Sequence, residues 1–303
     1  MTLAVGAGPA AEDVAAMQSA VLDWYAVNGR ALAFRRSSDP WSVLVSEVIA
    51  QQTQAARAAE AWTGFIRQFP TPAALAATPP ATVIRAWRGL GYNRRAVALR
   101  AAAVAIVEEH DGRVPDSFDA LVRLPGIGPY TATAVLAIAF ERPVAAIDTN
   151  IRRVVGRAFL GGEDAVRPAD LQRLADGFVP EGRAAAWTHA LMDVGAAYCR
   201  KRDPRCDACP LAGRCRYLAA GRPPPVAAAH RSPAMPFRST SRWLRGRILD
   251  RLRDATDGTW VDFGESIGEH DAVRVGTELR RLARDGLLEL DDPGTQARLR
   301  TTP

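Results

Sequence analysis

Four cysteines that lie close together are the residues of this sequence with the clearest chemical potential. They are Cys199, Cys206, Cys209 and Cys215, spaced C-x6-C-x2-C-x5-C, and the chain of 303 residues has no others. Thiolates grouped in this way bind a zinc ion or an iron–sulfur cluster. A structural zinc knuckle is one interpretation. Zinc sites usually pair two C-x2-C knuckles, whereas this segment has one, so the short loops favour a cubane cluster.

The cysteine segment is also strongly basic. Six arginine or lysine residues and two aspartates lie between positions 200 and 216. The whole chain has a formal net charge of +6, which favours a polyanionic partner. A basic loop that a metal cluster holds in place would suit contacts with DNA phosphates.

A short segment with two glycines, LPGIG at 124–128, lies between two predicted helices. Gly126 and Gly128 permit a tight turn and a close approach of the backbone. The N–H groups at the start of the following helix would then face a phosphate. The pattern predicts a helix-hairpin-helix that binds the DNA backbone without reading sequence. A plain turn between two helices is the alternative.

Two carboxylates stand where they could take part in acid–base chemistry. Glu47 lies within a largely apolar run, 43–50. Burial there would raise its pKa and let it act as a general acid near neutral pH. Its polar neighbours also allow an exposed helix face. Asp148 precedes the helical segment TNIRRVV and could be only an N-cap, although capping does not exclude catalysis.

Helices must position these residues, because the first 220 residues show only helical patterns. We expect helices over 11–34, 41–61, 94–110, 129–140, from 148, 168–178 and 183–197, and a short helix over 117–124. Residues 221–236 are rich in proline and alanine, which is typical of a linker. The remaining chain shows helices at 241–255 and 271–285 and strand-like segments at 257–265 and 286–290. That order resembles a winged helix-turn-helix.

The composition excludes some classes of protein. Hydrophobic residues make up 48% and charged residues 24% of the chain, which excludes a disordered chain and a coiled coil. No apolar run reaches the ~20 residues that a membrane helix needs. The N-terminus lacks a basic start and a compact apolar core, so we expect no secretory signal.

Taken together, these segments resemble the endonuclease III superfamily of DNA glycosylases, and within it the MutY-type adenine DNA glycosylases. SEVIAQQTQ (46–54) is similar to the family's catalytic-acid helix and GLGY (89–92) to its intercalating loop. LPGIGPYTA (124–132) is similar to its hairpin and IDTNIRRV (147–154) to its catalytic-aspartate segment. The cysteine spacing is similar to that of the family's iron–sulfur loop. The resemblance covers about residues 15–220 and implies one [4Fe-4S] cluster.

The resemblance also implies roles for single residues. Glu47 would protonate the flipped adenine, and Asp148, with Asn150 in the segment around it, would stabilise the oxocarbenium-like sugar. Tyr130 stands where the lyase members have their Schiff-base lysine, which implies a monofunctional enzyme. Gln52 and Tyr92 would wedge into the duplex. The full set of implied DNA contacts is Gln51, Gln52, Thr53, Tyr92, Leu124, Gly126 and Gly128.

The implied fold is mainly α, a helix-hairpin-helix glycosylase fold of two α-helical domains with an iron–sulfur loop. Residues 1–36 together with 142–220 would form the cluster domain, and residues 37–141 a six-helix domain. Residues 221–236 would be the linker and residues 237–303 a small winged-helix-like C-terminal module. The implied function is base excision repair of adenine mispaired with 8-oxoguanine or guanine in double-stranded DNA. The resemblance also implies a monomer in the bacterial cytoplasm, associated with the nucleoid through DNA.

Three features depart from the family pattern. Ala50 replaces a bulkier residue, and Asn93 stands where a second tyrosine is common. Residues 237–303 do not have the pattern of the pyrophosphatase-like domain that reads the oxidised guanine in typical members. This departure leaves the preferred opposing base open.

Two alternatives stand beside this interpretation. One is a bifunctional endonuclease III-like glycosylase/lyase for oxidised pyrimidines, although the single lysine, Lys201, lies in the cysteine loop. The other is a noncatalytic iron–sulfur DNA-binding regulator. The presence of both Glu47 and Asp148 in family positions argues against it.

Overall fold

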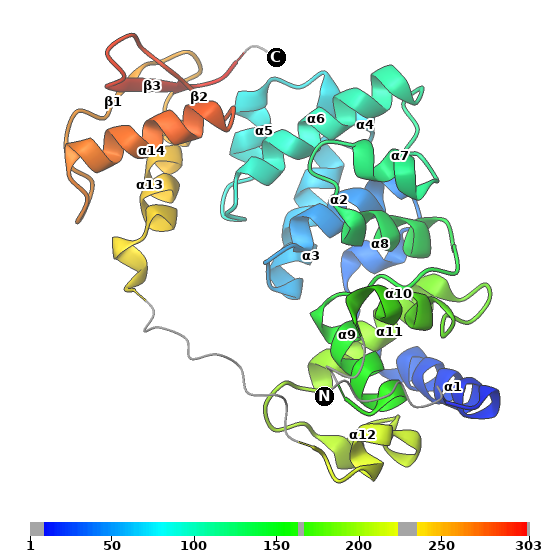
Figure 1. Ribbon diagram of the computed structural model, residues 1–303. Helices are drawn as coiled ribbons and strands as arrows, with labels where there is room; N and C mark the ends of the chain where they lie inside the picture. Colours follow the sequence, from blue (N-terminus) through cyan, green and yellow to red (C-terminus); the bar gives the residue numbers. More distant parts are fainter. Residues whose placement is uncertain (1–8, 163–166, 224–234, 302–303) are drawn as a thin grey trace. The chain divides into compact units, whose positions relative to one another are not determined.

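The computed structural model describes residues 9–162, 167–223 and 235–301 (Figure 1). Residues 224–234, most of the predicted linker, lie outside these ranges, as does the start of the N-terminus. Among the described residues, no helix is long and apolar enough to span a bilayer.

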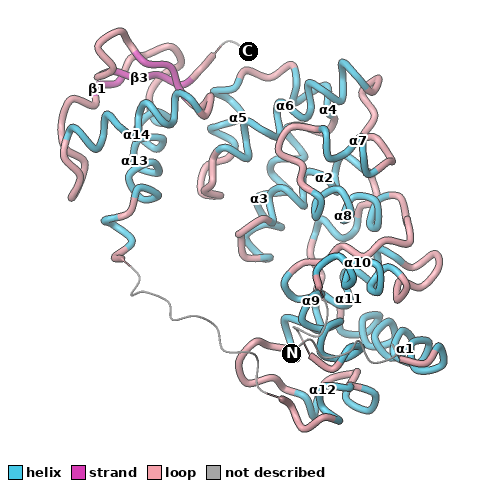
Figure 2. Tube along the Cα trace, in the orientation of Figure 1, coloured by secondary structure: helices cyan, strands magenta, loops and turns pink. Residues whose placement is uncertain are grey.

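Helices carry the described chain before residue 220, and no strand occurs in that described part, as the sequence predicts (Figure 2). The α-helices there are α1 (Ala11–Asn28), α2 (Pro40–Ala50), α3 (Ala55–Gln68), α4 (Pro72–Ala76), α5 (Pro80–Ala86), α6 (Arg94–Glu109), α7 (Phe118–Arg123), α8 (Pro129–Ala139), α9 (Thr149–Val154), α10 (Pro168–Asp176), α11 (Ala184–Ala197) and α12 (Arg216–Ala219). Shorter helical turns are η1 (Ala33–Arg36), the π-helical η2 (Val155–Phe159), η3 (Cys206–Ala208) and η4 (Ala212–Arg214).

Two predicted helices are shorter in the structure. The helix expected over 11–34 ends at Asn28, and Gly29 follows with φ −59° and ψ 136°. The backbone N–H of Arg30 donates to Oδ2 of Asp193, in α11, at 2.9 Å. After α1 the chain therefore bonds to α11 and does not continue the helix.

The helix expected over 41–61 is two helices. Helix α2 ends at Ala50, and Gln52, between α2 and α3, has φ 54°. Arg95 donates to the carbonyl oxygens of Val48 and Gln51 at 2.7 and 2.6 Å. A cation that binds the last carbonyls of a helix stabilises its end, and the amphipathic pattern alone does not reveal this partner.

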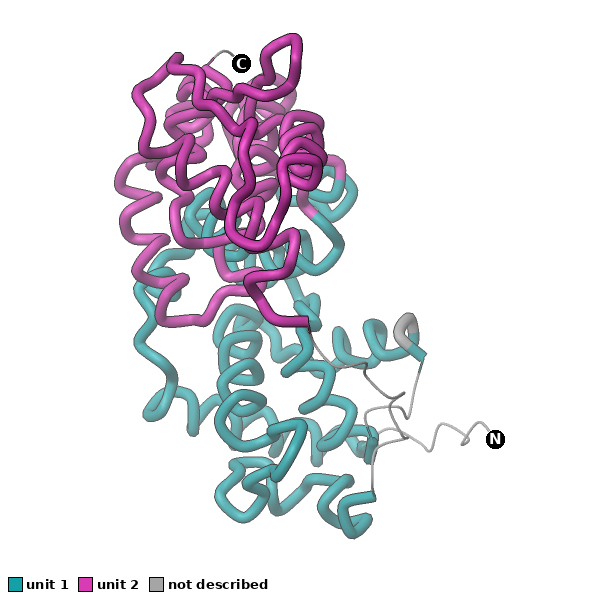
Figure 3. Tube along the Cα trace, turned by 90° about the vertical axis from the view of Figure 1, so that its left-hand side faces the viewer, with its two compact units in different colours: residues 1–47, 116–122, 128–230 teal, residues 48–115, 123–127, 231–303 magenta. Residues whose placement is uncertain are grey.

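The described chain forms two compact units (Figure 3). Unit 1 takes its described residues from 1–47, 116–122 and 128–230, and unit 2 from 48–115, 123–127 and 231–303. In unit 1, Met17 and Val21 of α1 pack with Trp187 and Leu191 of α11, all of them buried. This core includes Ile151 of α9, so it fixes the helix that follows Asp148.

The described C-terminal segment belongs to unit 2. It contains η5 (Phe237–Ser239), α13 (Ser241–Asp254), β1 (Val261–Asp262), α14 (Ala272–Arg284), β2 (Leu288–Leu290) and β3 (Gln296–Leu299). The strands form an antiparallel sheet in the order β1-β3-β2, with Leu288 opposite Leu299. Two helices with a small sheet agree with the expected winged-helix-like module. The sequence pattern did not predict β3, because only Ala297 and Leu299 in it are buried apolar residues.

This module shares its core with α5 of the same unit. Ile84 is fully buried against a group that includes Leu244 and Ile248 of α13. Arg253 of α13 donates through Nε to the carbonyl oxygen of Ile84 at 3.0 Å. The C-terminal segment is therefore packed onto the helical part of unit 2. The division into a cluster domain, a six-helix domain and a C-terminal module stays a prediction.

Candidate active site

Glu47 lies in α2 with its side chain buried. The residue is 8% exposed, so the alternative of an exposed helix face is wrong. Burial raises the pKa of Glu47 to about 7, against the opposing effects of the Tyr130 hydroxyl and the Arg35 charge. The negative charge of Asp148 raises the pKa further. A carboxyl group with such a pKa is protonated about half the time at neutral pH, as a general acid requires.

Tyr130 is the second residue of α8 and points to the same carboxyl group. Its hydroxyl donates to Oε2 of Glu47 at 3.0 Å. Burial, with the charges of Glu47 and Asp148, raises the pKa of Tyr130 well above its ordinary value. Tyr130 therefore stays protonated, and it orients Glu47 as a neutral hydrogen-bond donor.

Asp148 is the N-cap of α9, and it is also part of the Glu47 environment. Its Oδ1 accepts the N–H of Ile151 at 2.6 Å, and its Oδ2 accepts from Nδ2 of Asn150 at 3.1 Å. Burial raises the pKa of Asp148, while these hydrogen bonds and the charge of Arg153 oppose the rise. Because Asp148 acts on the pKa of both Glu47 and Tyr130, the fold brings the predicted carboxylates together.

Helix α11 approaches this segment closely. A Cβ atom on Gly195 would lie 2.6 Å from Cβ of Asn150, a distance that no side chain tolerates. Gly195 thus lets α11 support the residue that orients Asp148. The sequence analysis did not single out this glycine.

Two arginines of the site also escaped the sequence analysis. Arg153 donates through Nη2 to Oδ1 of Asn150 at 2.8 Å and through Nε to the carbonyl oxygen of Cys199. Arg153 therefore joins the Asp148 segment to the cysteine loop. Arg35 lowers the pKa of Glu47. Arg35 itself forms an ion pair with Asp193, with Nη1 of Arg35 2.7 Å from Oδ2 of Asp193. Arg153 lies in the segment IDTNIRRV, which the sequence analysis had singled out for Asp148. No neighbouring motif pointed to Arg35.

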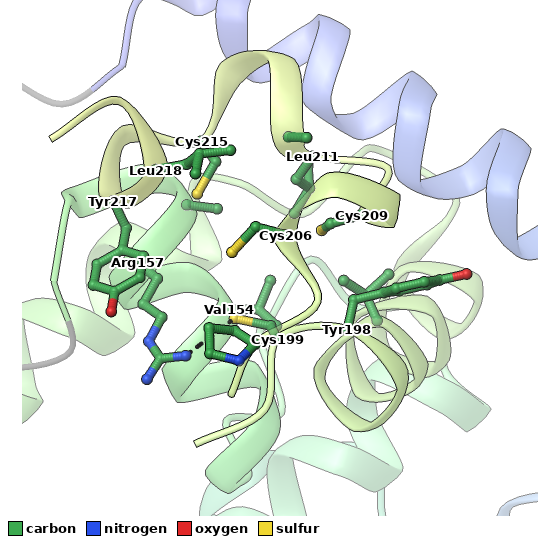
Figure 4. A pocket seen from close by; sticks show the side chains of 14 residues that line it. Val154, Arg157, Tyr198, Cys199, Cys206, Cys209, Leu211, Cys215, Tyr217 and Leu218 are labelled. Atoms are coloured by element: carbon green, nitrogen blue, oxygen red, sulfur yellow. Dashed lines mark hydrogen bonds between the residues drawn. The ribbon is translucent and has the colours of Figure 1, made fainter. Parts of the chain in front are cut away.

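The four cysteines line one pocket of unit 1 (Figure 4). Residues of α12 also line this pocket, whose empty volume is about 390 Å³. Arg157 lies beside it, with Nη1 3.9 Å from Sγ of Cys199 and its guanidinium 4.9 Å from the centre of the Tyr217 ring. Burial raises the pKa of Cys209 to about 12 and also raises that of Cys199 and of Cys215. Neutral thiols this buried must release protons when they bind a metal.

The four thiols are a donor set of the kind that holds a zinc ion or an iron–sulfur cluster. No group of three or more His, Cys, Asp or Glu side chains in the described parts of the chain is placed to hold one metal ion. The four cysteines nevertheless surround a common space (Figure 4).

Four of the predicted DNA contacts line one groove of unit 2. Gln51, Gln52, Tyr92 and Gly126 all line it. Gln52 and Tyr92 have φ values of 54° and 43°, and such left-handed backbone in residues other than glycine is costly and concentrates at functional sites. Gly126 has φ 76°, and a Cβ atom there would lie 2.6 Å from Cβ of Ala98, so the turn requires glycine.

The other three predicted contacts have local structural roles. Leu124 is 3% exposed, so its side chain belongs to the core. Gly128 is the N-cap of α8, and its carbonyl oxygen accepts the N–H of Ala132 at 3.0 Å. Thr53 donates through its hydroxyl to the carbonyl oxygen of Gln51 at 3.3 Å. Contact of these residues with DNA stays a prediction.

Comparison with known proteins identifies the family. Residues 45–179 match the model of the HhH-GPD superfamily of base excision DNA repair proteins. The adenine DNA glycosylase of Mycolicibacterium smegmatis is 41% identical over 271 residues, which are 89% of this chain and 91% of that protein. This chain belongs to the HhH-GPD superfamily, among the adenine DNA glycosylases of the MutY type.

Further relatives of this HhH-GPD protein agree. The adenine DNA glycosylase of Mycobacterium tuberculosis (strain H37Rv) is 43% identical over 239 residues, 78% of each chain. The solved structure of a thermostable thymine-DNA glycosylase matches with a TM-score of 0.65 and 28% identity, over 69% of this chain and 98% of that one. The family and the mainly α glycosylase fold expected from the sequence are confirmed.

Proposed function

We propose that this protein hydrolyses the N-glycosidic bond of adenine that is mispaired with 8-oxoguanine or guanine in duplex DNA. The relatives from Mycolicibacterium smegmatis and Mycobacterium tuberculosis, which are 41% and 43% identical, are adenine DNA glycosylases, which supports adenine as the target. A base inside a duplex must be flipped out for chemistry, at a cost that is smallest in a mispair. The proposal includes action as a monomer in association with DNA.

The observation that carries this proposal is the buried Glu47, which accepts a hydrogen bond from Tyr130 and whose pKa the charge of Asp148 raises. Glu47, with a pKa of about 7, gives its proton to N7 of the flipped adenine. The C1′–N9 bond then breaks, its electron pair stays with the base, and positive charge develops on the sugar. Asp148, ionised, stabilises that charge, as the second carboxylate does in other glycoside cleavages. Water adds at C1′, and its proton returns to Glu47.

Tyr130 and Asn150 act as positioning residues in this reaction. Tyr130 donates to Glu47, and Asn150 donates to Asp148, so each holds one carboxyl group in place. Tyr130 has no amine for a Schiff base, which supports hydrolysis without strand cleavage. Cys199, Cys206, Cys209 and Cys215 would hold one [4Fe-4S] cluster, which supplies a fixed geometry for the basic loop.

Single-turnover assays with excess enzyme test the proposal. The substrates are duplexes that pair one adenine with 8-oxoguanine, guanine or cytosine, and one further duplex that carries an oxidised pyrimidine. We expect adenine release from the first two, faster than from the adenine–cytosine duplex, and no covalent product after borohydride treatment. Release of an oxidised pyrimidine with strand cleavage, and no release of adenine, would support the glycosylase/lyase alternative and overturn the proposal.

A further inference from the structure

Unit 2 carries a large groove with an unassigned wall. Its empty volume is about 2040 Å³. The residues of one wall lie at 51–52, 89–95 and 125–127, which include the predicted wedge residues Gln52 and Tyr92. The other wall is α13 of the C-terminal module, with Arg242 and Trp243 near its start. Nothing in the chemistry of adenine removal calls for this helix.

The groove is strongly basic. Its lining includes one carboxylate, Asp250, and seven arginines, which are Arg57, Arg94, Arg95, Arg242, Arg245, Arg247 and Arg253. Four of them pair with Asp250 or with the neighbouring Asp285. The described structure gives no carboxylate partner to the other three, Arg57, Arg95 and Arg242. The groove therefore presents uncompensated positive charge, which a phosphodiester backbone would neutralise.

Arg242 also contacts a predicted wedge residue directly. Its Nη1 donates to the hydroxyl of Tyr92 at 3.1 Å, and its guanidinium carbon lies 4.3 Å from the centre of the Tyr92 ring. Arg95 lies 5.8 Å from the same ring. Tyr92 is 39% exposed, so its ring is held by two cations while it stays accessible. A stacked guanidinium fixes the plane of an aromatic ring in a way that an ammonium group cannot.

We propose that α13 forms one wall of the duplex-binding groove, where Arg242 contacts the DNA backbone and positions Tyr92 for insertion between bases. This inference rests on the proposed function, which makes duplex DNA the substrate. It gives the C-terminal module a role on the DNA.

The first test measures the affinity of the full-length protein for a duplex at several salt concentrations. Arg242→Ala should weaken binding about tenfold and lower the slope of log K against log salt by about 0.9, the loss of one phosphate contact. Arg251→Ala is the matched control, because Arg251 lies on the same helix but outside the groove lining. Equal affinity and equal slope for the two variants would overturn the proposal.

The second test separates the positioning of Tyr92 from charge alone. A 2-aminopurine base beside the adenine mispair reports unstacking at saturating enzyme. Arg242→Lys keeps the charge and should restore the salt slope, but it should leave the fluorescence increase at less than half the wild-type value. Full restoration of fluorescence by lysine would overturn the positioning role.

These tests distinguish failure of the groove assignment from failure of the proposed function. If the wild-type protein releases adenine and Arg242→Ala binds like Arg251→Ala, the groove assignment alone is wrong. If Arg242→Ala loses affinity and the wild-type protein releases no adenine, the groove assignment stands and the proposed chemistry is wrong.

Discussion

At the scale of single residues, Glu47 is placed for reactivity at a cost in stability. Its folded-state pKa of about 7 lies above the ordinary 4.5. The folded state therefore binds the proton more tightly, and the stabilisation present below pH 4.5 is lost as the pH rises through 7. The difference is about 3 kcal/mol, since each pKa unit corresponds to about 1.4 kcal/mol.

Glu47→Gln should separate activity from stability. Glutamine keeps the size of the side chain and cannot donate a proton to adenine, so the single-turnover rate should fall by at least about 10²–10⁴-fold. At pH 8 the variant should be more stable than the wild type, by as much as about 3 kcal/mol, because it buries no charge. Denaturation at pH 8 and adenine release check both. A variant that is inactive and less stable would point to a structural role instead.

The pH dependence of excision should have two limbs. Above pH 7 the rate should fall about tenfold per pH unit as Glu47 loses its proton. At low pH the rate should fall again when Asp148 becomes protonated, and burial, which raises its pKa, moves that limb above the ordinary range of aspartate. Single-turnover rates from pH 4 to 9 measure the profile. A rate that stays constant from pH 7 to 9 would exclude Glu47 as the acid.

Asp148→Asn tests whether this residue is more than a helix cap. Asparagine caps nearly as well as aspartate, so the melting temperature should change little. Excision should be lost, because the charge that offsets the sugar cation is removed. Loss of that charge should also lower the pKa of Glu47. Near-native excision by Asp148→Asn would leave Asp148 with the capping role alone.

At the scale of elements, the sequence predicted those helix boundaries that are determined by residues at the boundary itself. Pro129 and Asp148 mark the starts of α8 and α9. The apolar run of α2 favoured burial of Glu47, but its polar neighbours left an exposed helix face open, and the structure decides for burial. The break between α2 and α3 depends on Arg95, and the orientation of Tyr92 on Arg242, which is 150 residues away. Contacts this distant leave no periodic pattern, so a single sequence could not have revealed them.

The cysteine loop should lose its cofactor and its DNA affinity together. Cys209→Ser removes one ligand of the pocket, so iron content should fall well below four per chain, and duplex binding should weaken as the basic loop loosens. Ala212→Ser is the matched control, because Ala212 lines the same pocket and offers no thiol. Iron, sulfide and zinc analysis after anaerobic purification decides the outcome. Stoichiometric zinc in the wild-type protein would overturn the cluster assignment.

At the scale of the whole molecule, the proposed chemistry and the proposed duplex binding belong to different parts of the chain. Glu47, Tyr130 and Asp148 belong to unit 1, and the basic groove belongs to unit 2. Within unit 2, the C-terminal module shares a core with helix α5, in which Ile84 is fully buried. Removal of the module therefore has two separate effects, because it opens that core and it takes away one wall of the groove.

Truncation after Arg222 should keep the chemical step and lose stability and affinity. Exposure of the α5 face should cost several kcal/mol, since burying one isoleucine side chain stabilises a fold by about 1.5–3 kcal/mol. At saturating enzyme below the melting temperature, adenine release should stay within about tenfold of the wild type, because the catalytic residues are intact.

Full-length Ile84→Ala is the control: it should lose about 2–4 kcal/mol of stability and keep its affinity for duplex. If the truncated protein stays folded and releases no adenine even at saturation, the C-terminal module takes part in building the active site, and the separation of chemistry from duplex binding is wrong.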